Sequence, residues 1–174
     1  MISFCSNQTY TFIVFDTETT CTGKNAELCQ LSVIHENQVF SKYILPTGNA
    51  NTGASRANKL SVQNINGIKK LLKENQQVET VSLDIVKALQ EFHTFLSQVK
   101  CLSLKESCLV LIGHNNYSST FDTSIVLRKS DENFRSKLNN LKVYFGDSQI
   151  LFKHLLKDKH PALQLSESAS CKSF

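Results

Sequence analysis

The sequence predicts a single α/β domain built on a largely parallel sheet, and three observations carry this prediction. Residues 10–15 form an apolar run of aromatic and β-branched residues that closes on two acids. A second apolar run covers residues 108–112 and stops at Gly113. Stretches with helical spacing of apolar residues lie between and after these runs. Strands that alternate with helices are typical of layered α/β proteins.

Size and composition agree with one globular domain. The chain has 174 residues, 41% of them hydrophobic and 20% charged, with six Gly and two Pro. No apolar stretch approaches the ~20 residues that a membrane helix needs. The N-terminus has no basic region ahead of its apolar run, so we expect no signal peptide. The six cysteines include no C-x-x-C pair, which favours reduced thiols in the cytoplasm or nucleus over a zinc site or secretion.

The first half of the chain is expected to begin with three strands. Residues 10–16 are typical of a central buried strand. Residues 27–34 and 38–45 predict a hairpin around the polar segment 35–37. Residues 46–53 are expected to form a loop, and residues 61–74 a weak helix because four apolar residues recur there at helical spacing: Ile65, Ile68, Leu71 and Leu72.

The second half predicts alternating helices and strands. Residues 81–99 carry one apolar stripe and predict a helix with a packed core face. The strand at 108–112 is followed by a polar turn, a helix over 121–129, a strand over 141–145 and a helix across 150–156. We expect one domain over residues 1–174 with a core at about 10–163, because no linker or internal repeat interrupts it.

Two acids at the end of the first strand are the most informative feature. Asp16 and Glu18 are separated by one residue, so their side chains point to the same face of a strand, about 6–7 Å apart. Two such carboxylates repel each other unless a cation joins them. The pair therefore predicts a site for a hard divalent metal ion.

Asp122 is the next candidate. It lies shortly beyond the strand at 108–112, where open α/β sheets bind their ligands. Taken alone, Asp122 is better explained by a structural role, as an acid that complements the dipole at a helix N-terminus.

The two motifs together resemble those of the DEDD superfamily of 3′→5′ exonucleases. These motifs are Phe-Asp-Thr-Glu-Thr-Thr at 15–20 and Gly-His-Asn-x5-Phe-Asp at 113–122. The superfamily includes proofreading subunits, three-prime repair exonucleases and the exonuclease-like domain of the promyelocytic leukaemia protein. The resemblance implies a ribonuclease H-like fold, with a five-stranded mixed sheet in the order 3-2-1-4-5 and helices on both faces.

The resemblance also implies a site and a chemistry. Asp16, Glu18 and Asp122 match the metal ligands, while Thr19 and Asn115 match positions that touch the terminal nucleotide. Two Mg²⁺ or Mn²⁺ ions, about 3.5–4 Å apart, would serve hydrolysis of a phosphodiester bond. The implied partner is the single-stranded 3′ end of DNA or RNA, and no membrane. Family members form dimers through edge strands, so the resemblance also allows a homodimer. Asp147 matches an acid that is usually structural.

One motif of the superfamily has no match in this sequence. Neither His-x4-Asp nor Tyr-x3-Asp occurs, and His154 with Asp158 has the wrong spacing. The sequence therefore lacks the fourth carboxylate and the general base, and we expect it to lack the final catalytic helix. Three explanations stay open: a truncated exonuclease, a degenerate relative that binds nucleic acid or protein without cutting, and carboxylates with no nucleic-acid role. A truncated exonuclease would expose an apolar patch, whereas a dedicated binding module, inactive as an enzyme, would cover that surface with residues 150–174.

Charge is distributed unevenly along the chain. The net charge is +4, and residues 126–174 hold nine Lys or Arg against five Asp or Glu. A basic face beside an acidic metal site suits a polyanionic substrate. A solvated helix face is the alternative explanation for Lys153, Lys157 and Lys159.

Overall fold

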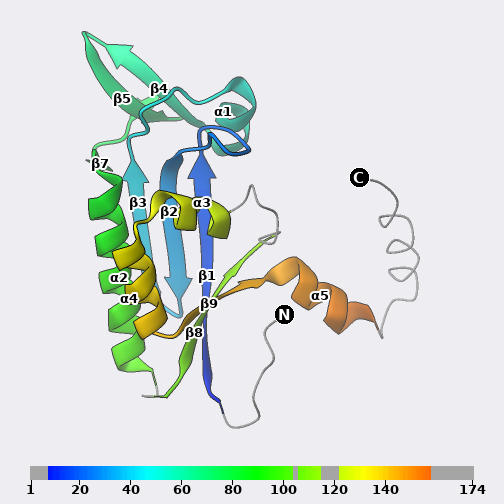
Figure 1. Cartoon of the computed structure of the whole chain (residues 1–174). Helices are drawn as coiled ribbons and strands as arrows, with labels where there is room; N and C mark the ends of the chain where they lie inside the picture. Colours follow the sequence, from blue (N-terminus) through cyan, green and yellow to red (C-terminus); the bar gives the residue numbers. More distant parts are fainter. Residues whose placement is uncertain (1–7, 104–105, 115–121, 158–174) are drawn as a thin grey trace.

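A computed structural model describes residues 8–103, 106–114 and 122–157, and the side chains up to residue 153 (Figure 1). The strands of the main sheet are β1 (Tyr10–Thr19), β2 (Leu28–His35), β3 (Gln38–Ile44), β7 (Val81–Ser82), β8 (Cys108–Gly113) and β9 (Val143–Asp147). A second, smaller sheet contains β4 (Leu60–Ile65), β5 (Ile68–Lys73) and β6 (Gln76–Gln77). The helices are α1 (Thr52–Asn58), α2 (Ile85–Leu102), α3 (Asp122–Lys129), α4 (Glu132–Asn140) and α5 (Ser148–Lys157).

The main sheet is mixed and has six strands in the order β7-β3-β2-β1-β8-β9. β1 pairs antiparallel with β2 and parallel with β8, and β8 pairs parallel with β9. The prediction of five strands in the order 3-2-1-4-5 was therefore wrong in strand count and order. The added strand, β7, is a two-residue edge strand beside β3, too short to leave a periodic signal in the sequence.

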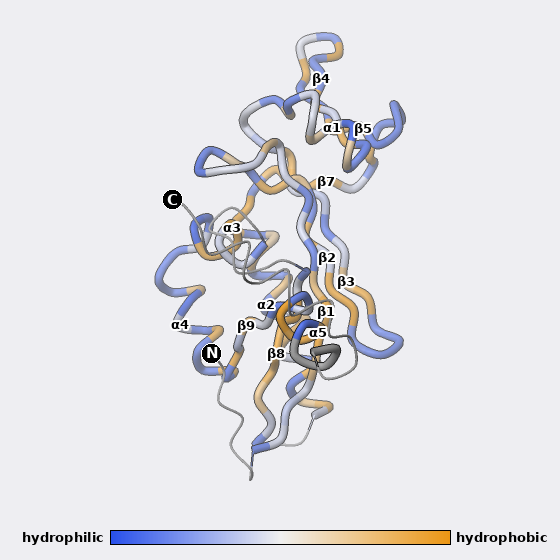
Figure 2. Tube along the Cα trace, turned by 90° about the vertical axis from the view of Figure 1, so that its right-hand side faces the viewer, coloured by the Kyte–Doolittle hydropathy of each residue, from blue (hydrophilic) through white to orange (hydrophobic). Residues whose placement is uncertain are grey.

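One face of this sheet carries the main core. Ile13 and Phe15 of β1 point to this face and are buried against residues of α2. The helix predicted over 81–99 begins only at Ile85, because Val81 and Ser82 form β7, and Leu83 and Val86 of its apolar stripe are exposed. The rest of the stripe is confirmed, since α2 buries Ala88, Leu89, Phe92, Phe95, Leu96 and Val99. Figure 2 shows β8 in the orange of hydrophobic residues, as expected for the strand that the second apolar run predicted.

The opposite face of the sheet exposes large apolar side chains. Register places Val14 beside Ile34, and Ile34 beside Val39. The exposed fractions on this face run from 45% to 66%, for Phe12, Val14, Ile34, Val39 and Tyr144. The described helices therefore leave these five side chains exposed. Most of residues 150–174, which a dedicated binding module would lay over this surface, lie outside the described residues, so the choice between the explanations stays a prediction.

The predicted helix over 61–74 is wrong, because these residues form the hairpin β4–β5. Asn66 and Gly67 both have positive φ, at 54° and 80°, and lie between the paired residues Ile65 and Ile68. Asn-Gly with positive φ at both positions is the preferred two-residue connection of a β-hairpin. The turn chemistry therefore outweighed the helical spacing of the apolar residues.

The small sheet packs on the main domain through a second apolar cluster. Leu60 of β4 and Leu71 of β5 are buried together with Cys29 of β2. Burial raises the pKa of the Cys29 thiol to about 12, which keeps it protonated and unreactive. This cluster fixes the hairpin near the end of β1, next to α1 (Figure 1).

Two helices were not predicted. α1 lies in the stretch expected to be a loop, and α4 between the predicted helix at 121–129 and strand at 141–145. Both begin with a polar side chain that accepts a hydrogen bond from the first turn, Asn51 from the Ala54 amide and Asp131 from the Phe134 amide. Within the described residues, no helix is long and apolar enough to span a membrane.

Candidate active site

Asp16 and Glu18 lie near the C-terminal end of β1. Register places Asp16 opposite Ser32 and Glu18 opposite Gln30, so both acids share the face that carries Val14. Asp16 is exposed and Glu18 is half-buried. The structure thus confirms that the two carboxylates share one face of a strand, as the spacing predicted.

Asp122 reaches β1 from the first turn of α3. Its Oδ1 accepts hydrogen bonds from the Thr17 amide at 3.1 Å and from the Thr17 hydroxyl at 2.5 Å. The β1–β8 ladder ends at Val14 and Ile112, so the Thr17 amide lies beyond the reach of β8. Asp122 provides the acceptor that the ladder no longer supplies, and its side chain is only 6% exposed. The structure therefore brings Asp122 to the segment that holds Asp16 and Glu18.

The three carboxylates affect one another electrostatically. Burial raises the pKa of Asp16, and a backbone hydrogen bond from Thr17 offsets part of that increase. Burial and then the charge of Asp16 raise the pKa of Glu18, and Asp122 adds to the effect. Burial raises the pKa of Asp122, where the Thr17 hydroxyl lowers it and Asp16 raises it. Mutual repulsion of this kind is what a bound cation would relieve.

A cleft of about 360 Å³ lies beside these carboxylates. Its walls come from the end of β1, from α1 and from α3, and its lining includes Glu18, Thr19, Gly53, Asn58 and Asp122. Gly53 and the small residues Ala54 and Ala57 keep the α1 wall low, which leaves room for a ligand. The cleft is therefore open to a molecule that contacts the carboxylates from the side of α1.

Asn58 connects α1 to the site. Its amide nitrogen donates to the Thr19 carbonyl at 3.1 Å, while its oxygen accepts from the Leu60 amide at 2.9 Å. Its side chain also hydrogen-bonds Glu18, which lowers the pKa of that carboxyl, although burial and Asp16 outweigh this effect. Asn58 was not among the predicted site residues. Its role depends on a tertiary contact across 39 residues, for which the local sequence has no signal.

The carboxylate oxygens of this site are ligands that Mg²⁺ and Mn²⁺ prefer. Within the described ranges, however, no three His, Cys, Asp or Glu side chains converge on one point where a metal could bind. Carboxylates without a cation are expected to stand apart, because their charges repel. The carboxylate oxygens are therefore suitable ligands for a hard divalent cation. To bind it, these side chains would have to move closer to one another.

Three more residues were predicted in or beside the site, and the structure describes two of them. Thr19 lines the cleft, and its backbone carbonyl is held by Asn58. Asn115 lies outside the described residues. Asp147 is buried and accepts a hydrogen bond from the Gln149 amide at 2.8 Å, at the start of α5. This helix-capping contact agrees with the structural role that the resemblance implied for Asp147.

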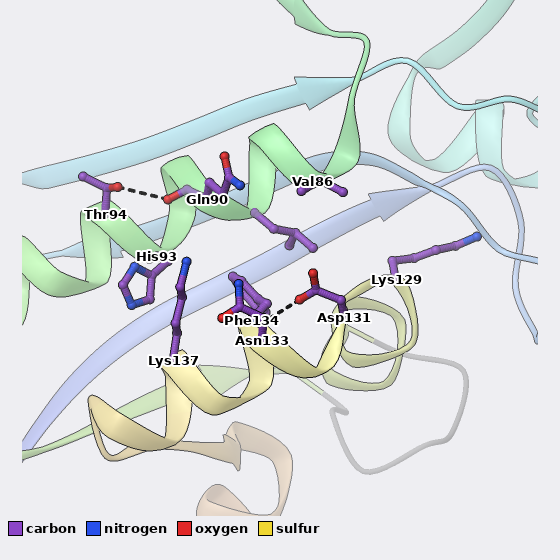
Figure 3. A pocket seen from close by; sticks show the side chains of 10 residues that line it. Val86, Gln90, His93, Thr94, Lys129, Asp131, Asn133, Phe134 and Lys137 are labelled. Atoms are coloured by element: carbon purple, nitrogen blue, oxygen red, sulfur yellow. Dashed lines mark hydrogen bonds between the residues drawn. The ribbon is translucent and has the colours of Figure 1, made fainter.

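A second pocket of about 140 Å³ lies between α2 and α4 (Figure 3). His93 and Lys137 face it, and the nearby charge of Lys137 adds to the effect of burial in lowering the pKa of His93. Asp131 also lines it, but its carboxylate is already used to cap α4. None of the predicted site residues borders this pocket, so we place the functional site at the cleft beside β1.

Fold and site together define a ribonuclease H-like domain: a mixed sheet with acidic residues at the end of its central strand. Comparison with known families agrees, because residues 10–160 match the Exuperantia RNase H-like domain. The chain belongs to this family. The match supports the ribonuclease H-like fold and a nucleic-acid-related, exonuclease-like module. No curated protein matches the chain significantly.

Proposed function

We propose that this domain binds the 3′ end of single-stranded nucleic acid in the cleft beside β1, with divalent cations held by Asp16, Glu18 and Asp122. The observation that carries the proposal is that Glu18 of β1 and Asp122 of α3, about a hundred residues apart, line one cleft and lie within electrostatic reach of Asp16. Carboxylates whose pKa values are raised by burial and by one another's charge are frequent at functional sites. Membership of a ribonuclease H-like family supports nucleic acid as the partner.

Each residue has a distinct part in this proposal. Asp16 and Glu18 would hold the cation from β1, and Asp122 from α3. Thr17 orients Asp122 through two hydrogen bonds, so it acts as a positioning residue. Asn58 holds both the Thr19 carbonyl and Glu18, and so keeps the α1 wall in contact with the carboxylates. A bound Mg²⁺ would supply charge neutralisation for the phosphate and acidify a coordinated water.

Hydrolysis by this chain is expected to be weak. The sequence contains no His-x4-Asp or Tyr-x3-Asp that could supply a general base and a fourth carboxylate. General base catalysis alone contributes roughly 10²–10⁴-fold to such reactions. We therefore infer a metal-dependent 3′→5′ exonuclease-type domain with impaired turnover. The alternative is a catalytically inactive nucleic-acid-binding or protein-interaction module, and the missing motif is the observation that favours it.

The experiment that tests the proposal is Mg²⁺-dependent release of 5′-mononucleotides from single-stranded DNA and RNA labelled in the 3′-terminal nucleotide. Slow release by the wild type, absent from the Asp16→Asn variant and absent when a chelator is added, would support an exonuclease-type function. Binding without any release would favour the inactive module. Absence of both binding and release would overturn the proposal.

A further inference from the structure

We propose that α1 and the β4–β5 hairpin form a basic rim that holds the phosphates of the strand leading into the cleft. The rim consists of Arg56, Lys59, Lys69, Lys70 and Lys73. This inference rests on the proposed function, since it names where the bound strand would run. It concerns residues that no motif of the exonuclease resemblance includes.

The rim has an unusual charge composition. Residues 37–73 include six Lys or Arg and no Asp or Glu. One of the six, Lys42, is paired with Glu91 of α2 at 2.7 Å. The other ion pair between described residues joins Lys142 to Glu106, far from the hairpin in sequence. None of the five rim cations forms an ion pair with a carboxylate within the described part of the chain, although the charges of Glu74 and Glu18 act on Lys73.

The hairpin directs two of its lysines toward the main domain. Lys69, Leu71 and Lys73 alternate onto one face of β5, and Leu71 is buried in the second apolar cluster. Lys69 donates to the Thr47 carbonyl, in the loop that precedes α1. Lys73 donates to the Tyr43 hydroxyl at 2.9 Å, and its ammonium lies 5.7 Å from the centre of the Tyr43 ring. Burial of Leu71 thus fixes where these two cations lie.

Lys73 connects the rim to the carboxylates. Its charge and that of Glu18 act on each other, which places the two side chains within electrostatic reach. On the other side, α1 lines the cleft with Ala57 and Asn58 and exposes Arg56 and Lys59. Figure 1 shows α1 and the hairpin together beyond the end of β1. Arg56 and Lys59 therefore lie on or next to the helix that lines the acidic cleft, and Lys73 lies within electrostatic reach of Glu18 at that cleft.

This arrangement suits a phosphodiester chain. A polyanion must approach Asp16, Glu18 and Asp122, and cations at the entrance lower the electrostatic cost of that approach. Lysines act as point charges that bind phosphates without reading the bases. A flexible single strand can follow cations spread over a helix and a hairpin. We therefore expect the rim to contribute affinity that is strongly salt-dependent and independent of base sequence.

The test measures binding of a fluorescent single-stranded oligonucleotide over a series of salt concentrations, in chelator. The rim variant is Lys69→Gln with Lys70→Gln and Lys73→Gln. The matched control makes the same charge change on α2 and α4, with Lys87→Gln, Lys100→Gln and Lys137→Gln. We expect the rim variant to bind about tenfold more weakly, with a salt slope smaller by about 2, since each contact to a single strand contributes about 0.7. The control should bind like the wild type.

Two further variants separate charge from structure. Lys70 donates to the exposed Gln77 side chain at 2.8 Å, so Lys70→Gln alone should fold normally and reduce the slope by about 0.7. Replacing all three lysines by Arg should restore binding. A wild type that binds neither in chelator nor in Mg²⁺ would count against the proposed function itself. A wild type that binds, with an unchanged slope in the rim variants or an equal loss in the control, would overturn the rim alone.

Discussion

Thr17 donates both its amide and its hydroxyl hydrogen to Asp122, at 3.1 and 2.5 Å. These two bonds join the end of β1 to the start of α3 where the β-ladder between β1 and β8 has ended. They orient the carboxylate that reaches the site from the second half of the chain. The contact also satisfies a nearly buried acid that would otherwise be costly to desolvate.

Removing the Thr17 hydroxyl should destabilise the domain. Thr17→Val keeps the side-chain shape but leaves Asp122 with one fewer hydrogen bond, so we expect a loss of about 1–2 kcal/mol in the free energy of unfolding. Urea unfolding measures this change. Thr94→Val is the matched control, because the Thr94 hydroxyl bonds only its own helix, at Gln90. Equal losses in the two variants would contradict a special role for the Thr17 contact.

The carboxylates should make the metal-free domain less stable as the pH rises. Each has a pKa raised by folding, so the folded state binds more protons than the unfolded state above the ordinary values of 3.8 and 4.5. Stability therefore falls as the pH rises from those values through the raised ones. Asp122→Asn should reduce this dependence and gain on the order of 1 kcal/mol at pH 7. Thermal unfolding in chelator from pH 4 to 8 provides the measurement, and a steeper dependence in the variant would contradict it.

Divalent cations should stabilise the domain through the same residues. At ten times its dissociation constant, a bound ion adds about 1.4 kcal/mol to the free energy of unfolding. Asp16→Asn combined with Glu18→Gln should abolish the increase in melting temperature on adding Mg²⁺ or Mn²⁺. Glu36→Gln is a suitable control, since Glu36 is an exposed acid in the turn between β2 and β3. Stabilisation that persists in the double variant would place the cation elsewhere.

Replacing glycine by alanine should lower the free energy of unfolding at Gly67, in the hairpin turn, but not at Gly53, in α1. Gly67 has φ of 80°, so Gly67→Ala should cost about 1 kcal/mol through backbone strain, although a Cβ there meets nothing within 4 Å. Gly53 has an ordinary φ inside α1, and its Cβ would be in normal contact with Asn51 at 3.5 Å, so Gly53→Ala should be neutral or stabilising. Chemical unfolding compares the two. A harmless Gly67→Ala would contradict the assigned turn.

The central strands and the acidic pair were predictable because each depends on a local pattern. An apolar run followed by Asp16 and Glu18 defines both a buried strand and the face of its last residues. The hairpin β4–β5 departs from the prediction for a local reason, since Ile65 and Ile68 recur at helical spacing while Asn66–Gly67 between them forms a tight turn.

Other parts of the site depend on contacts that the sequence does not encode locally. Asn58 reaches Thr19 across the fold, and Thr17 reaches Asp122 across 105 residues. The basic rim was hidden for another reason. Residues 1–125 have no net charge when summed, so the acid-free stretch at 37–73 was averaged out. Charge counted over shorter windows would have revealed it.

The central claim is that Asp16, Glu18 and Asp122 bind a cation that in turn binds the 3′ end of a strand. The most direct measurement compares oligonucleotide affinity in Mg²⁺ and in chelator at matched ionic strength. Matched ionic strength makes charge screening equal in the two buffers. We expect about tenfold tighter binding in Mg²⁺, retained in Glu36→Gln and lost in Asp16→Asn with Asp122→Asn. Equal or weaker wild-type affinity in Mg²⁺ would contradict this claim.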